Sequence, residues 1–297
     1  MNGILNILKP PGMTSFDVAA RVRSLLKAKK TGHTGTLDPL AAGVLPVCTG
    51  SATKAIEFMM DKDKLYRAEL TLGITTDTQD ASGEVLSEKA VTCSDEEIHA
   101  AVKAFEGKSA QVPPMYSAIK VDGRKLYEMA REGQTIDRAS RDIEIYSADV
   151  LRIKRDEKVR ILFDVHCSKG TYIRTLCEDI GEKLGCGGHM SFLLRKRAGA
   201  FDLSSAVTLE ELKQAVDAGN VASLLISAEK VFDGYGAIKL DGAREKKFRN
   251  GVHVELSELY SLEDGLVKVY NTDDAFIALG EVFEEDNVRL LKSRKFF

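Results

Sequence analysis

Residues 31–46 read TGHTGTLDPLAAGVLP and form the most distinctive segment of the 297-residue sequence. The segment holds three glycines and two prolines and has neither helical nor strand periodicity, so the sequence predicts a loop shaped by backbone chemistry. Pro39 favours an extended backbone at Asp38 and removes the next N–H donor, so the Asp38 carboxylate is fixed by its turn. Such a rigid acid is a candidate functional group, although an Asp-Pro turn is also a common way to start a loop.

The segment before this loop predicts a strand followed by a helix. Residues 3–10, GILNILKP, indicate a short buried strand that ends at a Pro-Pro-Gly turn. Thr14 and Asp17 then have the spacing of a capping box. The apolar residues that follow recur at helical intervals: Val18, Val22, Leu25 and Leu26. We therefore expect a helix that ends near Lys30, directly before the loop.

The segment after the loop predicts a helix, a strand and a second helix. A short helix is expected over 51–60. Apolar and polar residues then alternate from Tyr66 to Leu72, which indicates a half-buried strand that begins at Tyr66. Ser94 and Glu97 have capping-box spacing and predict a helix ended by Gly107.

The middle of the chain predicts a hairpin, two helices and a further strand. The apolar-rich runs 143–153 and 158–167 are joined by charged residues and indicate the hairpin. In 168–185 the period changes to 3.6, so a helix is expected with Arg174 in its first turn. Residues 189–202 indicate a strand, and 208–219 predict a capped helix.

Composition and hydropathy set the class of protein. With 44% hydrophobic and 29% charged residues, the chain suits one large or two modest globular domains, which excludes fibrous and disordered proteins. The longest stretch without Asp, Glu, Lys or Arg runs over 39–53 and is broken by glycine and proline, so no transmembrane helix is expected. The N-terminus has no export signal, and a cytoplasmic location is expected.

Charge and cysteine content point to a reduced protein with local basic clusters. The five cysteines are odd in number and predict free thiols. The net charge of −3 gives no general attraction to a polyanion, but basic residues gather at 21–30, 195–197 and 244–249. Each cluster could follow a phosphate backbone or form a solvated face.

The common cofactor motifs are absent from the sequence. It has no GxxxxGK[ST] loop and no GxGxxG after a strand, which argues against a kinase or a dehydrogenase. One set of residues contains zinc-type ligands without paired CxxC spacing: His166, Cys167, Cys177, Cys186 and His189. We therefore expect neither a metal nor an organic cofactor.

Five ordered blocks resemble the TruB family of pseudouridine synthases, the bacterial enzymes that act on uridine 55 of tRNA. The GHTGTLDPLAAGVLP loop resembles the aspartate motif of that family. Four other segments match in the same order: KPPGMTS, DKLYRAEL, PPMYSAIKVDGRKLYEMAR and SKGTYIRTL. The resemblance implies an α+β (mixed α/β) catalytic domain with a largely antiparallel central sheet over 1–235. Residues 236–297 resemble, more loosely, the small RNA-binding PUA module.

The resemblance implies a catalytic set. Asp38 is the essential carboxylate, Arg174 its cationic partner, and Tyr66 a surface on which the extruded uracil stacks. His33 would lie at the mouth of the pocket. The sequence leaves three routes open for Asp38: attack on ribose C1′, addition to uracil C6, or removal of a ribose proton.

The resemblance also implies further substrate-binding residues. Tyr172 is expected beside Arg174. The family commonly shows Leu-Arg-Arg where this sequence reads FLLRKR, which leaves Leu193 and Leu194 as alternatives for the apolar wall, and Leu193 is favoured. Lys9 is assigned to the substrate site, where it is expected to close the turn beneath the aspartate loop. Phosphate contacts are expected from the following residues: Lys120, Arg124 and Lys125.

The implied function is isomerisation of uridine 55 to pseudouridine in the T loop of tRNA, by a monomer without a cofactor, a membrane or an obligatory protein partner. One alternative is a non-catalytic RNA-binding or RNA-folding protein on the same scaffold. Another is a related synthase that modifies ribosomal RNA with a guide or accessory protein. The intact Asp38, Tyr66 and Arg174 argue against the first alternative, and a self-contained chain argues against the second.

Overall fold

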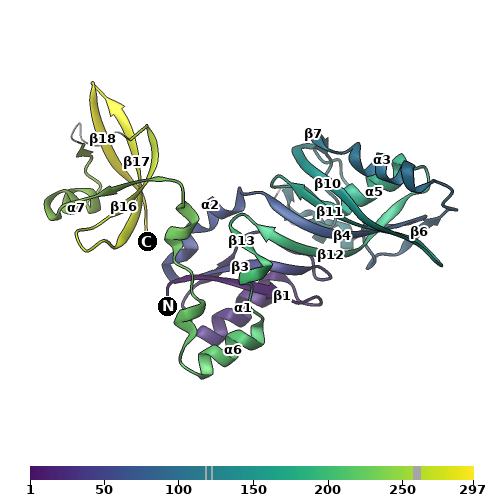
Figure 1. Ribbon diagram of the computed structural model, residues 1–297, viewed down its shortest axis with the longest axis horizontal. Helices are drawn as coiled ribbons and strands as arrows, with labels where there is room; N and C mark the ends of the chain where they lie inside the picture. The colour runs from purple at the N-terminus through teal and green to yellow at the C-terminus, as the bar shows by residue number, and fades with distance from the viewer. Residues whose placement is uncertain (118, 122, 257–261) are drawn as a thin grey trace.

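The computed structural model describes residues 1–117, 119–121, 123–256 and 262–297, and its centre is a nine-stranded sheet (Figure 1). The main order is β1-β3-β12-β4-β11-β10-β7, while β2 pairs with β3 and β13 pairs with β12. The strands have the following bounds: β1 Gly3–Lys9, β2 Thr31–His33, β3 Ala42–Thr49, β4 Lys64–Leu72, β7 Gly107–Gln111, β10 Arg141–Arg155, β11 Val159–Cys167, β12 Gly188–Ala198 and β13 Phe201–Asp202.

The sheet is mixed but largely antiparallel, which confirms the predicted fold class. Within the described residues, its one parallel pairing joins β3 to β12, with Ala42 opposite Leu194 and Gly43 opposite Arg195. A Cβ atom on Gly43 would lie 2.2 Å from the carbonyl oxygen of Arg195, and Gly43 has φ +118°. Only glycine therefore permits this close approach of the two strands.

Helices cover the two halves of the sheet separately. Helices α1 (Ser15–Leu26) and α6 (Leu209–Asp217) pack with β1 and β3 around one apolar core. Helices α3 (Asp95–Lys103) and α5 (Ile173–Lys183) pack with β4, β10 and β11 around another. The capping boxes predicted at Thr14, Ser94 and Thr208 are all present.

The remaining elements are short. None of the described helices combines the length and the apolar character needed to span a bilayer. The bounds are these: η1 Gly50–Ala55, α2 Ile56–Met60, β5 Ile74–Thr76, β6 Val85–Glu88, β8 Lys120–Val121, β9 Arg124–Lys125, α4 Leu126–Arg131, η2 Leu203–Ser205, η3 Val221–Leu224 and η4 Ala228–Phe232.

The prediction of a loop over the whole of 31–46 was wrong at both ends. The segment starts within β2 and, from Ala42, continues into β3, so the irregular part is confined to 34–41. Strand β3 is buried along nearly its whole length, and a strand covered on both faces lacks the alternation that would reveal it. The helix expected to reach Lys30 ends at Leu26, where Lys27 adopts a left-handed conformation.

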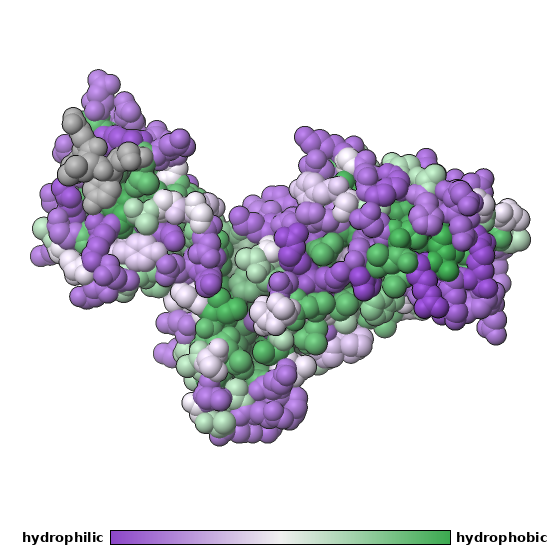
Figure 2. All heavy atoms as spheres, viewed as in Figure 1, coloured by the Kyte–Doolittle hydropathy of each residue, from purple (hydrophilic) through white to green (hydrophobic). Residues whose placement is uncertain are grey.

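In the described residues of the C-terminal part, a five-stranded sheet in the order β14-β16-β17-β18-β15 is accompanied by one helix (Figure 1). Residues 257–261, which fall within the predicted 236–297 module, lie outside the described residues. On the face drawn in Figure 2, hydrophilic side chains cover most of this part, while hydrophobic ones gather over β1, β3 and α1. The bounds are these: β14 Gly236–Lys239, α7 Gly242–Arg249, β15 Val254–Glu255, β16 Gly265–Tyr270, β17 Phe276–Glu285 and β18 Val288–Phe296.

Aromatic side chains join the two sheets. The fully buried Phe232 ring has its centroid 5.2 Å from Phe58 of α2, 5.9 Å from Phe276 of β17 and 5.5 Å from Phe297. An ion pair between Glu57 and Lys295 lies beside this cluster. The rings remove apolar surface of both parts from water, which stabilises their contact.

We expect Phe232→Ala to lower the free energy of unfolding by about 3 to 5 kcal/mol, because it empties the centre of the aromatic cluster. Denaturant unfolding followed by circular dichroism measures the change. Phe192→Ala is the matched control, since Phe192 is 43% exposed, and it should cost less than about 1 kcal/mol. Equal losses in the two variants would contradict the assigned role of Phe232.

Candidate active site

An open cleft of about 1400 Å³ contains most of the residues predicted to form the site. One wall is the loop that carries Asp38, and another is the start of α5 with Arg174. Tyr66 of β4 and Leu193 of β12 also line it. Segments far apart in the sequence therefore meet in a single cavity.

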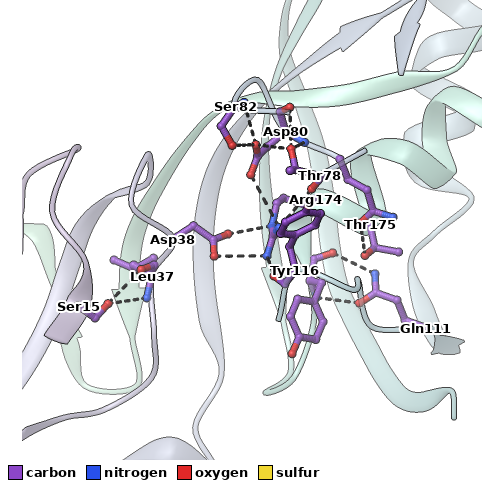
Figure 3. Close-up of polar contacts among 12 residues, drawn as sticks. Ser15, Leu37, Asp38, Thr78, Asp80, Ser82, Gln111, Tyr116, Arg174 and Thr175 are labelled. Carbon is purple, nitrogen blue, oxygen red and sulfur yellow. Dashed lines mark hydrogen bonds and ion pairs between the residues drawn. The ribbon is translucent and has the colours of Figure 1, made fainter. Parts of the chain in front are cut away.

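Asp38 and Arg174 form a two-pronged ion pair in this cleft (Figure 3). Arg174 Nε lies 2.9 Å from Asp38 Oδ2, and Arg174 Nη2 donates to Asp38 Oδ1 at 3.4 Å. The Arg174 side chain is 6% exposed, whereas that of Asp38 is 33% exposed. The carboxylate is thus held from behind by a buried guanidinium and remains open to the cleft.

Three groups besides Asp38 hold the guanidinium of Arg174. Its Nη1 donates to the Thr78 carbonyl at 3.2 Å, and its Nη2 donates to the Tyr116 carbonyl at 2.8 Å. Asp80 Oδ2 lies 3.8 Å from Nη1, and the same residue's Oδ1 accepts hydrogen bonds from Thr78 Oγ1 and Ser82 N. These contacts fix the orientation of the Arg174 guanidinium toward Asp38 (Figure 3).

The first turn of α5 is held by a side chain from another strand. Tyr172 occupies the N-cap position, and Gln111 of β7 accepts from the Tyr172 N–H at 2.8 Å and donates to the Tyr172 carbonyl at 3.1 Å. Gln111 thus fixes the backbone of the residue that precedes α5, two positions before Arg174. The sequence reading missed both Asp80 and Gln111; the polar run 75–84 was the available signal for Asp80.

The loop that carries Asp38 is fastened from below. Ser15 Oγ accepts from the Leu37 N–H at 2.8 Å and donates to the Leu37 carbonyl at 3.1 Å. Lys9 Nζ donates to the carbonyls of Ala41 at 2.6 Å and Pro39 at 3.2 Å. Lys9 is fully buried and does not line the cleft, so it lies where the KPPG turn was expected to close the loop.

Two family models cover most of the chain. Residues 23–173 match the TruB family pseudouridylate synthase N-terminal domain, and 174–231 match the tRNA pseudouridylate synthase B C-terminal domain.

The chain belongs to the TruB family of pseudouridine synthases.

The predicted family is therefore confirmed, and the chain is a pseudouridine synthase, an isomerase. It is 50% identical to the tRNA pseudouridine synthase B of Alkaliphilus oremlandii over 291 residues, 97% of this chain and 95% of that one. It is 44% identical to the protein of the same name from Clostridioides difficile, over the full length of both chains.

Solved structures agree with the family assignment. An archaeal box H/ACA sRNP Nop10-Cbf5 complex contains a chain that superposes with a TM-score of 0.71 at 25% identity, over 99% of this chain and 85% of that one. A chain of a Cbf5-Nop10-Gar1 complex superposes with a TM-score of 0.72 at 27% identity, over 99% of this chain and 84% of that one. The superpositions extend into the C-terminal sheet.

Burial and charge set the protonation of the acid in this synthase. Burial raises the pKa of Asp38, and the nearby Asp80 raises it further, while Arg174 and Lys9 lower it. Burial lowers the pKa of Lys9 to about 8, opposed by the charge of Asp38. The cations therefore counteract the desolvation that would otherwise protonate the Asp38 carboxylate.

The other predicted pocket residues line the same cleft as Asp38. Burial raises the pKa of Tyr66, so its phenol stays neutral, and Tyr66 lies opposite Arg195 of β12 in the sheet. His33 lines the cleft, its Nδ1 is buried without a hydrogen-bond partner, and burial lowers its pKa. Leu193 lines the cleft, whereas Leu194 does not.

Of the three residues predicted to contact phosphates, Lys120 and Lys125 line the cleft and Arg124 does not. Strands β8 and β9 form a hairpin that places Lys120 and Lys125 along the cleft. Arg124 instead forms an ion pair with Glu132 at 2.6 Å and does not line the cleft.

The basic run 195–197 is not a continuous phosphate track. Arg195 is 1% exposed and donates from Nε to the Val44 carbonyl at 2.8 Å and from Nη2 to the Gly35 carbonyl at 3.2 Å. Lys196 and Arg197 form ion pairs with two aspartates of other segments. Arg195 is therefore occupied inside the protein, and the charges of Lys196 and Arg197 are paired with those aspartates.

Glu178, four residues after Arg174 on α5, accepts a hydrogen bond from Gln79, and burial raises the pKa of Glu178 to about 7. Within the described part of the chain, no three His, Cys, Asp or Glu side chains gather closely enough to hold a metal ion.

We expect Lys9→Met to loosen the aspartate loop, because the carbonyls of Pro39 and Ala41 lose their buried donor. The free energy of unfolding should fall by about 1 to 3 kcal/mol. Hydrogen exchange should become faster at the amides of 38–42, measured by mass spectrometry. Lys120→Met, on the β8–β9 hairpin, is the control, and unchanged exchange in Lys9→Met would contradict this role.

Proposed function

We propose that this synthase converts uridine 55 to pseudouridine in the T loop of tRNA. The observation that carries the proposal is the two-pronged Asp38–Arg174 pair at the base of an open cleft. The relatives in Alkaliphilus oremlandii and Clostridioides difficile, both named tRNA pseudouridine synthase B, support tRNA as the substrate.

The reaction exchanges one glycosidic bond for another. The bond from ribose C1′ to uracil N1 breaks, the uracil turns, and a bond forms from C1′ to C5. The C5 hydrogen leaves as a proton to water, and N1 takes up a proton, so no redox partner or cofactor is required. Asp38 serves as the nucleophile toward C1′ or C6, or as the base that removes a ribose proton.

Each of these roles needs an ionised Asp38. A base that fills the cleft would displace water from the carboxylate and raise its pKa further. The Arg174 fork opposes that shift through charge-assisted hydrogen bonds, each worth about 1.5 to 3 kcal/mol. Its own contacts to Thr78, Asp80 and Tyr116 aim the carboxylate before substrate arrives.

The cleft suits a nucleotide lifted out of an RNA stack. Tyr66 offers a ring for the extruded uracil, and stacking of a base on an aromatic ring is worth about 1 to 3 kcal/mol. Leu193 supplies an apolar wall, and Tyr172 borders the opposite side beside Arg174. His33, neutral at the mouth, takes the place of the departed base in the loop.

We assign residues 1–235 to catalysis and 236–297 to a PUA-like module that binds RNA away from the target uridine. The module begins with β14 at Gly236 and carries the basic helix α7. Lys120 and Lys125 beside the cleft would meet phosphates of the T stem-loop. The enzyme acts in the cytoplasm as a monomer, without an obligatory protein partner.

Release of tritium tests the reaction itself. A tRNA transcript labelled at uracil C5 should lose its label to water with the natural chain, and at least about 10³-fold more slowly with Asp38→Asn. Binding of the transcript should be retained in that variant. If the natural chain bound tRNA but released no tritium, the non-catalytic RNA-folding alternative would replace this proposal.

The pH dependence of release tests the charges around Asp38. Activity should fall as the pH drops through the raised pKa of Asp38, because the protonated acid is inactive. Asp80→Asn should shift this fall in activity to lower pH, since it removes a negative charge that raises the pKa of Asp38. Arg174→Gln should move it to higher pH and reduce the maximal rate about 10²-fold.

Both variants are tested by single-turnover rates between about pH 4.5 and 8. Lys120→Met is the control, and it should leave the pH at which activity falls unchanged. Shifts of the same sign in Asp80→Asn and Arg174→Gln would contradict the assignment of Asp38 as the titrating group.

A further inference from the structure

Phe16 is an aromatic residue that the catalytic proposal does not use. Its side chain is 74% exposed, more than any other large apolar residue in the described ranges. It lines the same cleft as Asp38 and His33. A single exposed phenylalanine is unremarkable on an ordinary surface, but here the ring lies at the rim of a nucleotide-binding cavity.

The position of Phe16 is fixed by its neighbours in the first turn of α1. Thr14 Oγ1 accepts from the Asp17 N–H at 3.1 Å, and Asp17 Oδ2 accepts from the Thr14 N–H at 3.0 Å. This capping box holds the turn on both sides of Phe16. The ring therefore projects from a rigid helix start.

The same turn is tied to the catalytic loop. Ser15 is almost completely buried and exchanges two hydrogen bonds with the backbone of Leu37, directly before Asp38 (Figure 3). Phe16 directly follows Ser15 in the sequence, and Asp38 directly follows Leu37. The Ser15–Leu37 hydrogen bonds therefore link the segments that carry the ring and the carboxylate. The ring and the carboxylate keep a constant spacing along one wall of the cleft.

Extrusion of one nucleotide exposes the faces of the bases beside it. An aromatic ring at the rim can cover such a face, and the contact tolerates any base because every base has a π-face. The cations Lys120 and Lys125 line the same cleft and can hold the phosphates of the strand. A planar apolar ring and nearby cations are the combination that single-stranded RNA requires.

We propose that Phe16 is a stacking platform for an unpaired nucleobase that neighbours the target uridine. The inference rests on the proposed function for its substrate and adds a binding residue outside the catalytic set. Phe16 contributes to RNA affinity and leaves the chemistry to Asp38 and Arg174.

A protein–RNA double-mutant cycle tests the stacking. Dissociation constants are measured for a T stem-loop hairpin with the full chain carrying Asp38→Asn, so that no substrate is consumed. The same background then receives Phe16→Ala, Phe16→Trp or Phe192→Ala. Each protein is also measured with hairpins that carry one abasic site at successive loop positions beside the target.

Phe16→Ala should weaken binding of the intact hairpin about tenfold, Phe16→Trp should restore it, and Phe192→Ala should leave it unchanged. With one of the abasic hairpins, the difference in affinity between Phe16→Ala and its parent should vanish, which identifies the partner base. Thermal melting should be unaltered, because the ring is exposed.

Equal affinities of Phe16→Ala and its parent for the intact hairpin would overturn the proposal, and so would a loss that persists with every abasic hairpin. Tritium release is measured separately with Asp38 intact. A natural chain that releases no tritium defeats the proposed function, whereas a chain that releases it while Phe16→Ala binds normally defeats only the stacking platform.

Discussion

The contact between a partly exposed carboxylate and a buried guanidinium is the constraint on which this synthase depends. Asp38 lines the cleft, and burial raises its pKa, so the acid tends to take up a proton. Arg174 opposes this tendency only while its own position is fixed. Two backbone carbonyls and Asp80 fix it, so the polar groups behind the guanidinium matter as much as the ion pair itself.

The loop that presents Asp38 is irregular and gains its order from other segments. Lys9 holds it from β1, Ser15 holds it from α1, and Arg195 holds its earlier part from β12. Each of these side chains bonds to backbone carbonyls that no strand satisfies. Buried polar groups of this kind need partners, and here the partners also set the direction of the carboxylate.

Local signals in the sequence predicted much of the fold. The capping boxes at Thr14 and Ser94 located two helices, and the alternation after Tyr66 located β4. Strand β3 was missed, because its burial on both faces depends on β1 and β12, which are distant in sequence. The motifs identified Asp38 and Arg174, but the roles of Gln111 and Arg195 arise from bonds to remote backbone groups, which no spacing reveals.

The parallel seam between β3 and β12 has a consequence for biosynthesis. The ribosome completes β3 about 150 residues before it completes β12, and translation at about 5 to 20 residues per second makes that interval roughly 8 to 30 seconds. During this time the nascent β3 edge at Gly43 has no neighbour on the side that β12 will occupy. An unpaired strand edge can pair with other chains. A chaperone would therefore matter most during this interval, while the N-terminal segment has left the ribosome and β12 has not yet been made.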